Sequence, residues 1–413
     1  MAGGRIVKLP RDGKDPILIA NITGGECQFD GVWNQKQCGR PLGMRFDSKG
    51  TLYVVDAFFG IKKVDIVSGK VDNVFDPRGV SVDGQEILFL DDIALDEGAG
   101  SKGGHVFYAT DVSSKYDLDV CFISFLSDDR SGRVLRYDSD SRKVSVVAKG
   151  FAFPNGIELQ DDKQAVIVSE IAARRLLRIT IKGNDSGKVS ILNGNLPCMV
   201  DNVRRSPRQD QETYWLACFG AHKERDRMDK MRQYPYITKA ILRFSYNLGT
   251  LLMKIGEKTG IDAIIDFGYH VRGLEVLLIA DPVKKAGLVI EADRNGTPIR
   301  SLQDPDGEVS FFSEVHEIRE AGKRHLYLAS FINPYVVKVT IDDEVASPVR
   351  SNAPPAPPSK PSAKPASSTT TTTTTKKPTK SAATAKPTAK ATPKVQAKPS
   401  GEKVSEKKKK QEL

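Results

Sequence analysis

The stretch Pro41-Leu-Gly-Met-Arg-Phe46, Asp47-Ser-Lys-Gly50, Thr51-Leu-Tyr-Val-Val-Asp56 decides the fold of this chain. A short apolar strand is followed by a polar turn, and the turn by a second strand that is almost continuously apolar. A third strand of alternating polarity, Gly60-Ile-Lys-Lys-Val-Asp65, leads to another turn, Val67-Ser-Gly-Lys70. Period-two strands separated by Gly and Asp turns predict an antiparallel sheet built from consecutive hairpins.

The same order of strands and turns recurs four more times, with later copies that begin at Asp92, Asn155, Asp201 and Glu314. A spacing of about 45 to 65 residues between such units is typical of propeller blades. A parallel α/β fold would need helical crossovers between the strands, and most of this chain has no helical pattern. We therefore predict an all-β propeller.

One part of the chain departs from the repeat, between Ile237 and about Lys285. The apolar residues in Leu248–Lys258 and Ile261–Phe267 have the spacing of short amphipathic helices. Such helices could form a lid over a central pocket, a face that leans on a membrane, or a packed insertion with no further role. The sequence leaves these alternatives open.

The C-terminal segment 345–413 differs sharply in composition from residues 1–344, which we assign to the propeller domain. It holds 15 Lys and Arg against 3 Asp and Glu, and is dominated by Pro, Ala, Thr, Ser and Lys. Such a segment cannot bury enough apolar surface to fold, so we predict a disordered, mucin-like tail, either O-glycosylated at the run Thr369–Thr375 or an unmodified linker. The remaining 47 basic and 49 acidic residues nearly balance. We therefore expect the tail to bind polyanions, and no specific nucleic-acid site on the fold.

The cysteines and glycosylation sequons bear on the compartment. Cys27 and Cys38 lie close together in a polar loop, where a short disulfide is expected and two free thiols are the alternative. The other cysteines, Cys121, Cys198 and Cys218, are predicted to be buried thiols within strands. Sequons for N-glycosylation occur at Asn21, Asn184 and Asn295. These features favour a secretory setting, although the first residues show no signal sequence and no stretch approaches the roughly 20 apolar residues of a membrane span.

Five short motifs in a fixed order resemble the strictosidine synthase-like family, and the resemblance covers nearly all of residues 4–341. The motifs are Cys38-Gly-Arg-Pro-Leu-Gly43, Phe153-Pro-Asn-Gly-Ile157, Asp201-Asn-Val-Arg-Arg-Ser-Pro207, Leu302-Gln-Asp-Pro-Asp-Gly307 and Ser313-Glu-Val-His-Glu317. The resemblance implies a six-bladed β-propeller. Because Gly4–Leu9 resembles an outer strand of the first blade, we expect that blade to be incomplete in this chain and the N-terminal membrane anchor of relatives to be absent. The resemblance also implies a location in the secretory pathway: the endoplasmic reticulum lumen, the cell surface or the outside of the cell after secretion.

The resemblance further implies a calcium ion on the propeller axis. The residues that would hold Ca²⁺ begin successive inner strands and are Asp91, Asp92, Asn155, Asp201 and Asn202. Carboxylate and amide oxygens are the ligands that Ca²⁺ prefers. Asn-Gly and Asp-Asn also form turns, which is the plainer interpretation of any one of these pairs.

The implied activity is calcium-dependent hydrolysis of small-molecule aryl esters or lactones, and the alternative is a non-catalytic luminal or cell-surface glycoprotein that binds partners. His316 is the candidate general base and Glu314 a second catalytic candidate, although a histidine near a sheet is often only structural. Strictosidine synthase activity is not expected, because Ser313 stands where that enzyme has its catalytic Glu, and Glu314 is one residue away and faces the other side of the strand. The C-terminal Lys410-Gln-Glu-Leu413 loosely resembles a retrieval signal of the endoplasmic reticulum.

Overall fold

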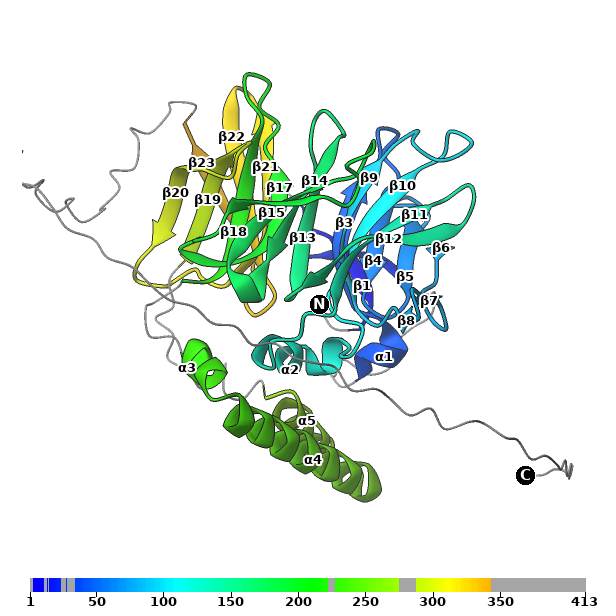
Figure 1. Ribbon diagram of the computed structural model, residues 1–413, viewed down its shortest axis with the longest axis vertical. Helices are drawn as coiled ribbons and strands as arrows, with labels where there is room; N and C mark the ends of the chain where they lie inside the picture. The colour runs from blue at the N-terminus through cyan, green and yellow to red at the C-terminus, as the bar shows by residue number, and fades with distance from the viewer. Residues whose placement is uncertain are drawn as a thin grey trace, which may run out of the picture. The chain divides into compact units, whose positions relative to one another are not determined.

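The computed structural model describes residues 3–10, 13, 15–23, 27, 34–221, 227–274 and 287–342 (Figure 1). Strands dominate these residues, as the sequence predicts. The predicted tail, 345–413, lies outside the described residues. None of the helices within the described ranges is both long and apolar enough to cross a membrane.

Five antiparallel sheets follow one another along the chain, each made of strands that pair in chain order. The first contains β3 (Pro41–Phe46), β4 (Leu52–Asp56), β5 (Gly60–Val64) and β6 (Val71–Phe75). The second contains β9 (Leu90–Asp96), β10 (Val106–Asp111), β11 (Gly132–Asp138) and β12 (Lys143–Phe151). The third contains β13 (Pro154–Leu159), β14 (Ala165–Glu170), β15 (Arg175–Thr180) and β16 (Val189–Asn193).

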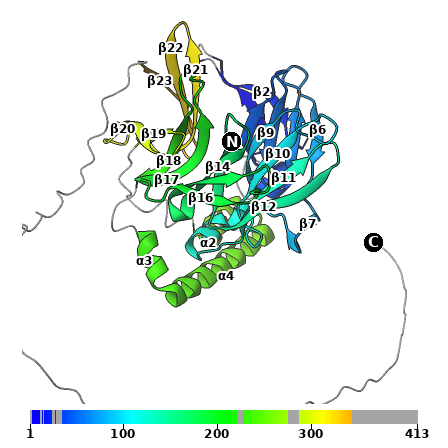
Figure 2. The same ribbon diagram turned by 45° about the horizontal axis from the view of Figure 1, so that its top comes forward.

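The last two sheets complete the series. The fourth contains β17 (Cys198–Arg205), β18 (Thr213–Ala221), β19 (Gly287–Asp293) and β20 (Pro298–Asp304). The fifth contains β21 (Phe312–Glu320), β22 (Lys323–Ser330) and β23 (Val337–Ile341). The first strands of consecutive sheets, β3, β9, β13, β17 and β21, lie against one another as the inner strands (Figures 1 and 2).

Two small strand pairs stand outside this series. β1 (Arg5–Lys8) pairs with β2 (Ile17–Asn21), and β7 (Ser81–Val82) pairs with β8 (Gln85–Glu86). Ile6 of β1 and Ala20 of β2 pack on Val54 of β4. Among the described strands β1 has no partner other than β2, which fits the outer-strand assignment of this segment. The count of six blades stays a prediction.

In the first four sheets the second strand is buried on both faces, and this explains its almost continuous apolar sequence, whereas in β22 buried residues alternate with more exposed ones. In β10, Phe107 packs toward β4, while the next residue, Tyr108, packs toward β14 on the other side. In β18, Leu216 packs toward the third sheet, and the preceding residue, Trp215, packs toward the fifth. The core is therefore a series of layers between neighbouring sheets, which is the packing of a β-propeller.

Acidic side chains at the ends of three second strands accept hydrogen bonds from the backbone just before the inner strand of the same sheet. Asp111 accepts a hydrogen bond from the backbone N–H of Phe89 (3.4 Å), and Glu170 accepts one from that of Ala152 (2.8 Å). Asp56 holds the backbone of Arg40 in the same way. Each acid thus fixes where the inner strand of its own sheet begins.

Short helices and a helical insertion lie on one side of the sheets. They comprise α1 (Gln35–Cys38), the 3-10 turns Leu118–Val120 and Ile171–Ala173, α2 (Cys121–Leu126), and, between β18 and β19, α3 (Arg227–Gln233), α4 (Pro235–Thr259) and α5 (Asp262–Arg272). The first expected helix, Leu248–Lys258, is the C-terminal part of α4, which has 25 residues, and the second, Ile261–Phe267, corresponds to the first part of α5. Gly249 and Gly256 do not break α4, because they face α5, where a Cβ on Gly249 would lie 2.3 Å from the backbone N of Arg272. Residues 275–286 of the region lie outside the described part.

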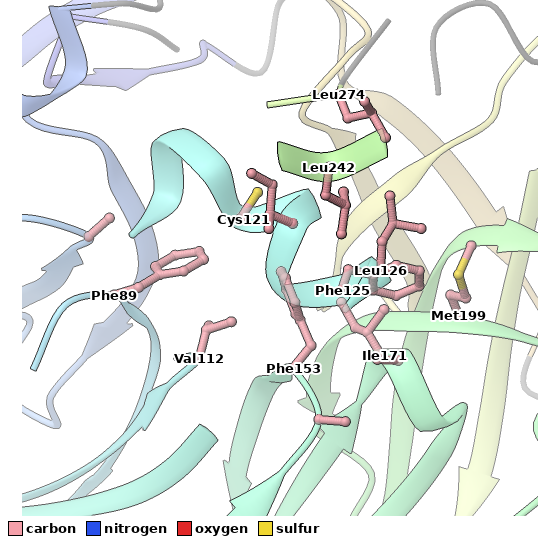
Figure 3. Close-up of a cluster of buried hydrophobic side chains, with 14 residues drawn as sticks. Phe89, Val112, Cys121, Phe125, Leu126, Phe153, Ile171, Met199, Leu242 and Leu274 are labelled. Atoms are coloured by element: carbon pink, nitrogen blue, oxygen red, sulfur yellow. The ribbon is translucent and has the colours of Figure 1, made fainter. Parts of the chain in front are cut away.

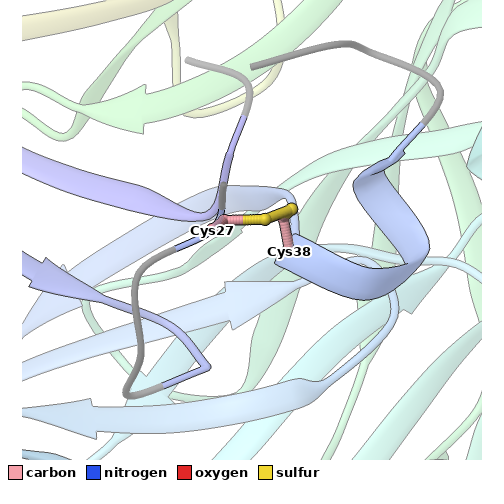
Figure 4. The surroundings of a disulfide bond; sticks show 2 residues. All are labelled: Cys27 and Cys38. Atoms are coloured by element: carbon pink, nitrogen blue, oxygen red, sulfur yellow. A yellow bond between two sulfur atoms is a disulfide. The ribbon is translucent and has the colours of Figure 1, made fainter. Parts of the chain in front are cut away.

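The structure confirms one disulfide and corrects the assignment of two thiols. Cys27 and Cys38 are bonded, with Cα atoms 5.5 Å apart (Figure 4). Cys198 and Cys218 were expected as thiols but are also bonded, with a Cα distance of 5.7 Å that a disulfide readily spans. The register of β17 on β18, which shifts between Met199 and Val200, brings the two together and is not readable from their sequence separation. Cys121 is buried, but it begins α2 and does not lie in a strand.

The three predicted glycosylation sites differ in exposure. Asn184 and Asn295 lie in exposed turns, whereas Asn21 ends β2 and is half-buried. Their modification stays a prediction.

The buried ion pair of Arg133 and Asp111 gives a test of the fold. Arg133 is 1% exposed, contacts Asp111 (Nε–Oδ2, 3.0 Å) and donates to the carbonyl oxygens of Val82 and Glu86. Arg133→Met would leave a buried carboxyl without its cation and the β7–β8 hairpin without its anchor. We expect the free energy of unfolding to fall by about 3–5 kcal/mol in urea denaturation.

The matched control is Arg130→Met, which removes an exposed guanidinium paired with Asp128. Exposed pairs contribute only about 0–1 kcal/mol. Equal losses in the two variants would show that the buried pair does not anchor the hairpin.

Candidate metal-binding ring on the propeller axis

Every inner strand shifts register at the same point along its length. In four of the five sheets, two residues of the inner strand stand opposite one residue of the second strand, which is a β-bulge. The bulge residues are Leu42 and Gly43 in β3, Asp91 and Asp92 in β9, Asn155 and Gly156 in β13, Asp201 and Asn202 in β17, and the single residue Ser313 in β21. The structure therefore brings all five predicted metal ligands to one level of the inner strands.

Hydroxyl groups lock neighbouring bulges together. Thr110, opposite the bulge of β9, donates to the backbone carbonyl of Asn155 in the next sheet (2.6 Å). Ser169, opposite the bulge of β13, donates to the carbonyl of Asp201 in the sheet after that (2.6 Å). The same contact thus repeats from sheet to sheet and fixes the spacing of the ring residues.

Glycine in two of the bulges allows a very close approach. A Cβ on Gly43 would lie 2.1 Å from Oδ1 of Asp92, and one on Gly156 would lie 2.5 Å from the backbone N of Val203. Any side chain at these positions would push neighbouring inner strands apart. The glycines of the Leu-Gly and Asn-Gly motifs therefore serve strand packing, which a turn interpretation does not capture.

Asp91 and Asp201 are two neighbouring acids that form no ion pair with any described residue, although the charge of Arg204 acts on both. Burial, reinforced by the charge of Asp92, raises the pKa of Asp91 to about 8. Burial and the charge of Asp91 likewise raise the pKa of Asp201 well above its usual value. Among the described residues, none donates a hydrogen bond to either side chain or forms an ion pair with it.

Two amide oxygens complete the ring. Oδ1 of Asn155 and Oδ1 of Asn202 are buried and accept no hydrogen bond from the part of the chain that the structure describes. The amide nitrogen of Asn202 donates to Glu314 (3.2 Å), which leaves its oxygen directed elsewhere. Two carboxylates and two amide oxygens form an all-oxygen donor set, which suits a hard cation such as Ca²⁺. The described residues contain no group of three or more His, Cys, Asp and Glu placed for a metal, so these amides would be essential ligands.

Asp92 differs from the other predicted ligands. Its Oδ2 accepts hydrogen bonds from Arg204 (2.7 Å), Arg45 (3.3 Å) and the backbone N–H of Ile157 (2.9 Å). Burial alone would raise the pKa of Asp92, but the charges of Arg204 and Arg45 hold it below its usual value. Its carboxylate is therefore already engaged, beneath the ring, by two guanidinium groups.

These arginines belong to a charged layer that sequence reasoning missed. Arg204 also contacts Glu314 (Nη2–Oε2, 2.6 Å), and Arg45 lies 3.5 Å from Glu158. A signal was present in the sequence, because Arg45, Glu158 and Arg204 each stand three residues after the first bulge residue of their strand. The offset becomes meaningful only once the bulges are located.

The two predicted catalytic residues lie at this layer, on β21. Glu314 is partly exposed and accepts hydrogen bonds from Arg204 and Asn202. His316 likewise stands three residues after the bulge residue of its strand, Ser313, and its side chain is open to solvent. Partial desolvation lowers the pKa of His316. The charge of Glu314 raises this pKa, and the charge of Arg204 lowers it. His316 is therefore neutral at pH 7 and able to accept a proton.

An apolar roof covers the end of the inner strands nearest the ring (Figure 3). Phe89, Phe153 and Met199 each precede the first bulge residue of their strand by two positions, and they pack with Phe125 of α2 and Leu242 of α4. A second aromatic group continues this apolar surface beside Ser313, in which Phe219 lies 5.1 Å from Phe331 and 5.9 Å from Phe311 between ring centroids. A polar ring beneath an apolar cover can hold the charged part of a ligand against its hydrophobic part.

Comparison with known proteins places this architecture in a family. The strictosidine synthase family model matches residues 101–184. Adipocyte plasma membrane-associated protein of Salmo salar is 32% identical over 345 residues, which cover 82% of this chain and 72% of the relative. The Homo sapiens protein of that name is 28% identical over 343 residues, which cover 82% and 71%. A gluconolactonase structure from Xanthomonas campestris aligns over 79% of this chain and 76% of its own, with 11% identity and a TM-score of 0.44. The chain belongs to the strictosidine synthase-like family, together with the adipocyte plasma membrane-associated proteins.

Proposed function

We propose that this protein is a calcium-dependent hydrolase of esters or lactones whose ion binds to Asp91, Asn155, Asp201 and Asn202. One observation supports the ion above all others. Two neighbouring acids, the buried Asp91 and the half-buried Asp201, have no ion-pair partner among the described residues, and two buried amide oxygens beside them lack a donor. Such an arrangement is unfavourable without a cation and is relieved by one.

The chain's own residues would divide the work of binding and of proton transfer. A bound Ca²⁺ would polarise the carbonyl oxygen of the substrate and stabilise the negative charge that develops there. Asp91 and Asp201 would lose their protons on binding the ion. Arg45 and Arg204 keep Asp92 in place below, so we assign Asp92 to the support of the ring and not to the ligand set.

His316 would act as the general base, because its lowered pKa leaves it neutral and it is open to solvent. The apolar roof lies on the other side of the ring from His316, so it would shield the ion from water and would not contact a substrate held at His316. Condensation of the strictosidine synthase type is not proposed, because Ser313 occupies the bulge of β21 and its hydroxyl faces the carbonyl of Ala329.

A non-catalytic propeller that binds partners is the second candidate. The engagement of Glu314 by Arg204 and Asn202 favours it, because a carboxylate held by two donors is a structural group more readily than an acid catalyst. Either function suits the secretory pathway, where two disulfides are stable and where we place the protein.

The ion can be tested by stability. Calcium at about 100 times its dissociation constant should stabilise the protein by about 2.7 kcal/mol, measured as a rise in Tm, and Mg²⁺ should do much less. The double variant Asn155→Ala/Asp201→Ala should lose this response, whereas Asp128→Ala, at an exposed carboxylate, should keep it. An equal calcium response in all three proteins would refute the assigned ligands.

The pH dependence of the calcium-free protein gives a second test. The folded state keeps a proton on Asp91 up to pH about 8, whereas the unfolded chain loses it near pH 4. Because the unfolded state then binds fewer protons, the free energy of unfolding should fall as the pH rises from about 4 to 8. Denaturation in the presence of a chelator should show this fall, and saturating calcium should remove it. An unchanged pH profile in Asp91→Asn would contradict the proposal.

The hydrolase activity is tested with simple aryl esters and lactones, with and without a calcium chelator. His316→Gln should lower kcat by about 10²–10⁴-fold and leave the calcium-induced rise in Tm intact. The Asn155→Ala/Asp201→Ala variant should lose both activity and the rise in Tm. Calcium stabilisation without any hydrolysis would exclude the hydrolase and leave the partner-binding propeller.

A further inference from the structure

The helix α4 has three faces with different chemistry. Its buried face carries Thr238, which bonds to α3, Leu242, which joins the apolar roof, and Ser245, Gly249 and Gly256, which pack on α5. Further contacts fix the helical insertion to the propeller, among them the hydrogen bond from Gln35 to the hydroxyl of Tyr269 (2.7 Å) and the ion pair of Arg272 with Asp119 (3.3 Å). The outward faces of α4 are thus held in a defined orientation.

A second face is an exposed apolar stripe. Its members, with exposed fractions, are Ile237 (59%), Ile241 (41%), Phe244 (69%), Leu248 (37%), Leu251 (55%) and Ile255 (41%). The intervals alternate between four and three residues, so the side chains form one continuous row about 27 Å long. Soluble proteins rarely expose such a row unless something binds to it.

The third face is basic. Lys239, Arg243, Lys254 and Lys258 are exposed, and α4 contains one acidic residue, Glu257. No described residue forms an ion pair with any of these four cations. At 100° per residue, the basic face lies roughly 115° around the helix from the stripe, on the side away from α5.

We propose that this face of α4 docks on the surface of an anionic lipid bilayer, with the apolar stripe in the acyl–headgroup boundary and the basic side chains on the lipid phosphates. An exposed apolar row bordered by Lys and Arg is the pattern of helices that lie in the plane of a membrane. Phe244, the most exposed member of the stripe, would enter the boundary most deeply.

Charge distinguishes this partner from a second copy of the chain. Two α4 helices that met along their stripes would bring together two helices that each carry four Lys or Arg side chains and one Glu. Like charges beside a helical seam oppose self-association. An anionic surface instead complements the net positive charge of the helix.

The test uses the full chain and phosphatidylcholine vesicles with or without about 30% phosphatidylserine. Phe244→Ser/Leu251→Ser and, separately, Lys254→Glu/Lys258→Glu should each weaken binding to the anionic vesicles at least about tenfold. Val189→Ser/Ile191→Ser, which removes exposed apolar side chains from β16, should bind as the parent does. Because all of these side chains are exposed, Tm should remain unchanged in each variant.

The lysine-rich tail also attracts anionic lipid, so insertion of the stripe needs its own measurement. Phe244→Trp places a fluorophore on the stripe, and we expect its emission to shift to the blue and to be quenched by brominated lipid. Absence of quenching, with equal vesicle binding by the parent and the Ser variant, would assign binding to the tail alone and overturn the proposal. Lipid-free dimerisation that Phe244→Ser/Leu251→Ser abolishes would overturn it in favour of a second copy.

Discussion

The hydrogen bonds from Thr110 and Ser169 to the ring carbonyls of the next sheet are the contacts on which the centre of this propeller depends. Among the described residues, neighbouring sheets share no backbone ladder, so packing alone would allow the inner strands to slide along one another. The hydroxyl of Thr110 lies 2.6 Å from the carbonyl of Asn155 and 3.4 Å from that of Asp92 in its own sheet, so sliding would lose the shorter hydrogen bond. The bulges therefore stay at one level, and the ring follows from that level.

Three layers are arranged relative to the bulges. Two residues before the first bulge residue lies an apolar side chain of the roof, such as Phe153. At the bulge lies an oxygen donor, and three residues after it lies a charged or titratable group, such as Arg204 or His316. β13 and β17 contribute to all three layers in turn, whereas β3 has Leu42 and Gly43 at its bulge and β9 has Ala94 three residues after Asp91. The ionic layer keeps Asp92 charged, while Asp91 and Asp201, in the layer above it, have no ion-pair partner among the described residues.

Much of the fold and part of the site could be predicted from the sequence, for identifiable reasons. Period-two strands and Asp-Gly turns are local signals, so the blades were readable in order. The ring residues were readable because Asn155 and Asp201 recur at equivalent places. The ion pairs of Asp92 could not be predicted from the sequence, because Arg45 and Arg204 reach this residue from two other sheets. The Cys198–Cys218 bond likewise depends on a register shift that leaves no trace in composition.

The length of α4 was not predicted for a related reason. The apolar spacing indicated only Leu248–Lys258 as the first helix, and this stretch contains Gly249 and Gly256, which lower the helix propensity of an isolated segment. In the fold these glycines let α5 approach so closely that packing outweighs propensity. The same approach turns Leu242 inward to the roof and leaves Ile241, its neighbour, on the outward stripe. One helix therefore forms part of the cover of the axial site and also presents an apolar face to the surroundings. A ligand that dissolves in lipid would meet the outer face of the same helix whose inner face lines the roof. The stripe and the roof can vary separately in sequence, but the glycines between them cannot change without moving both.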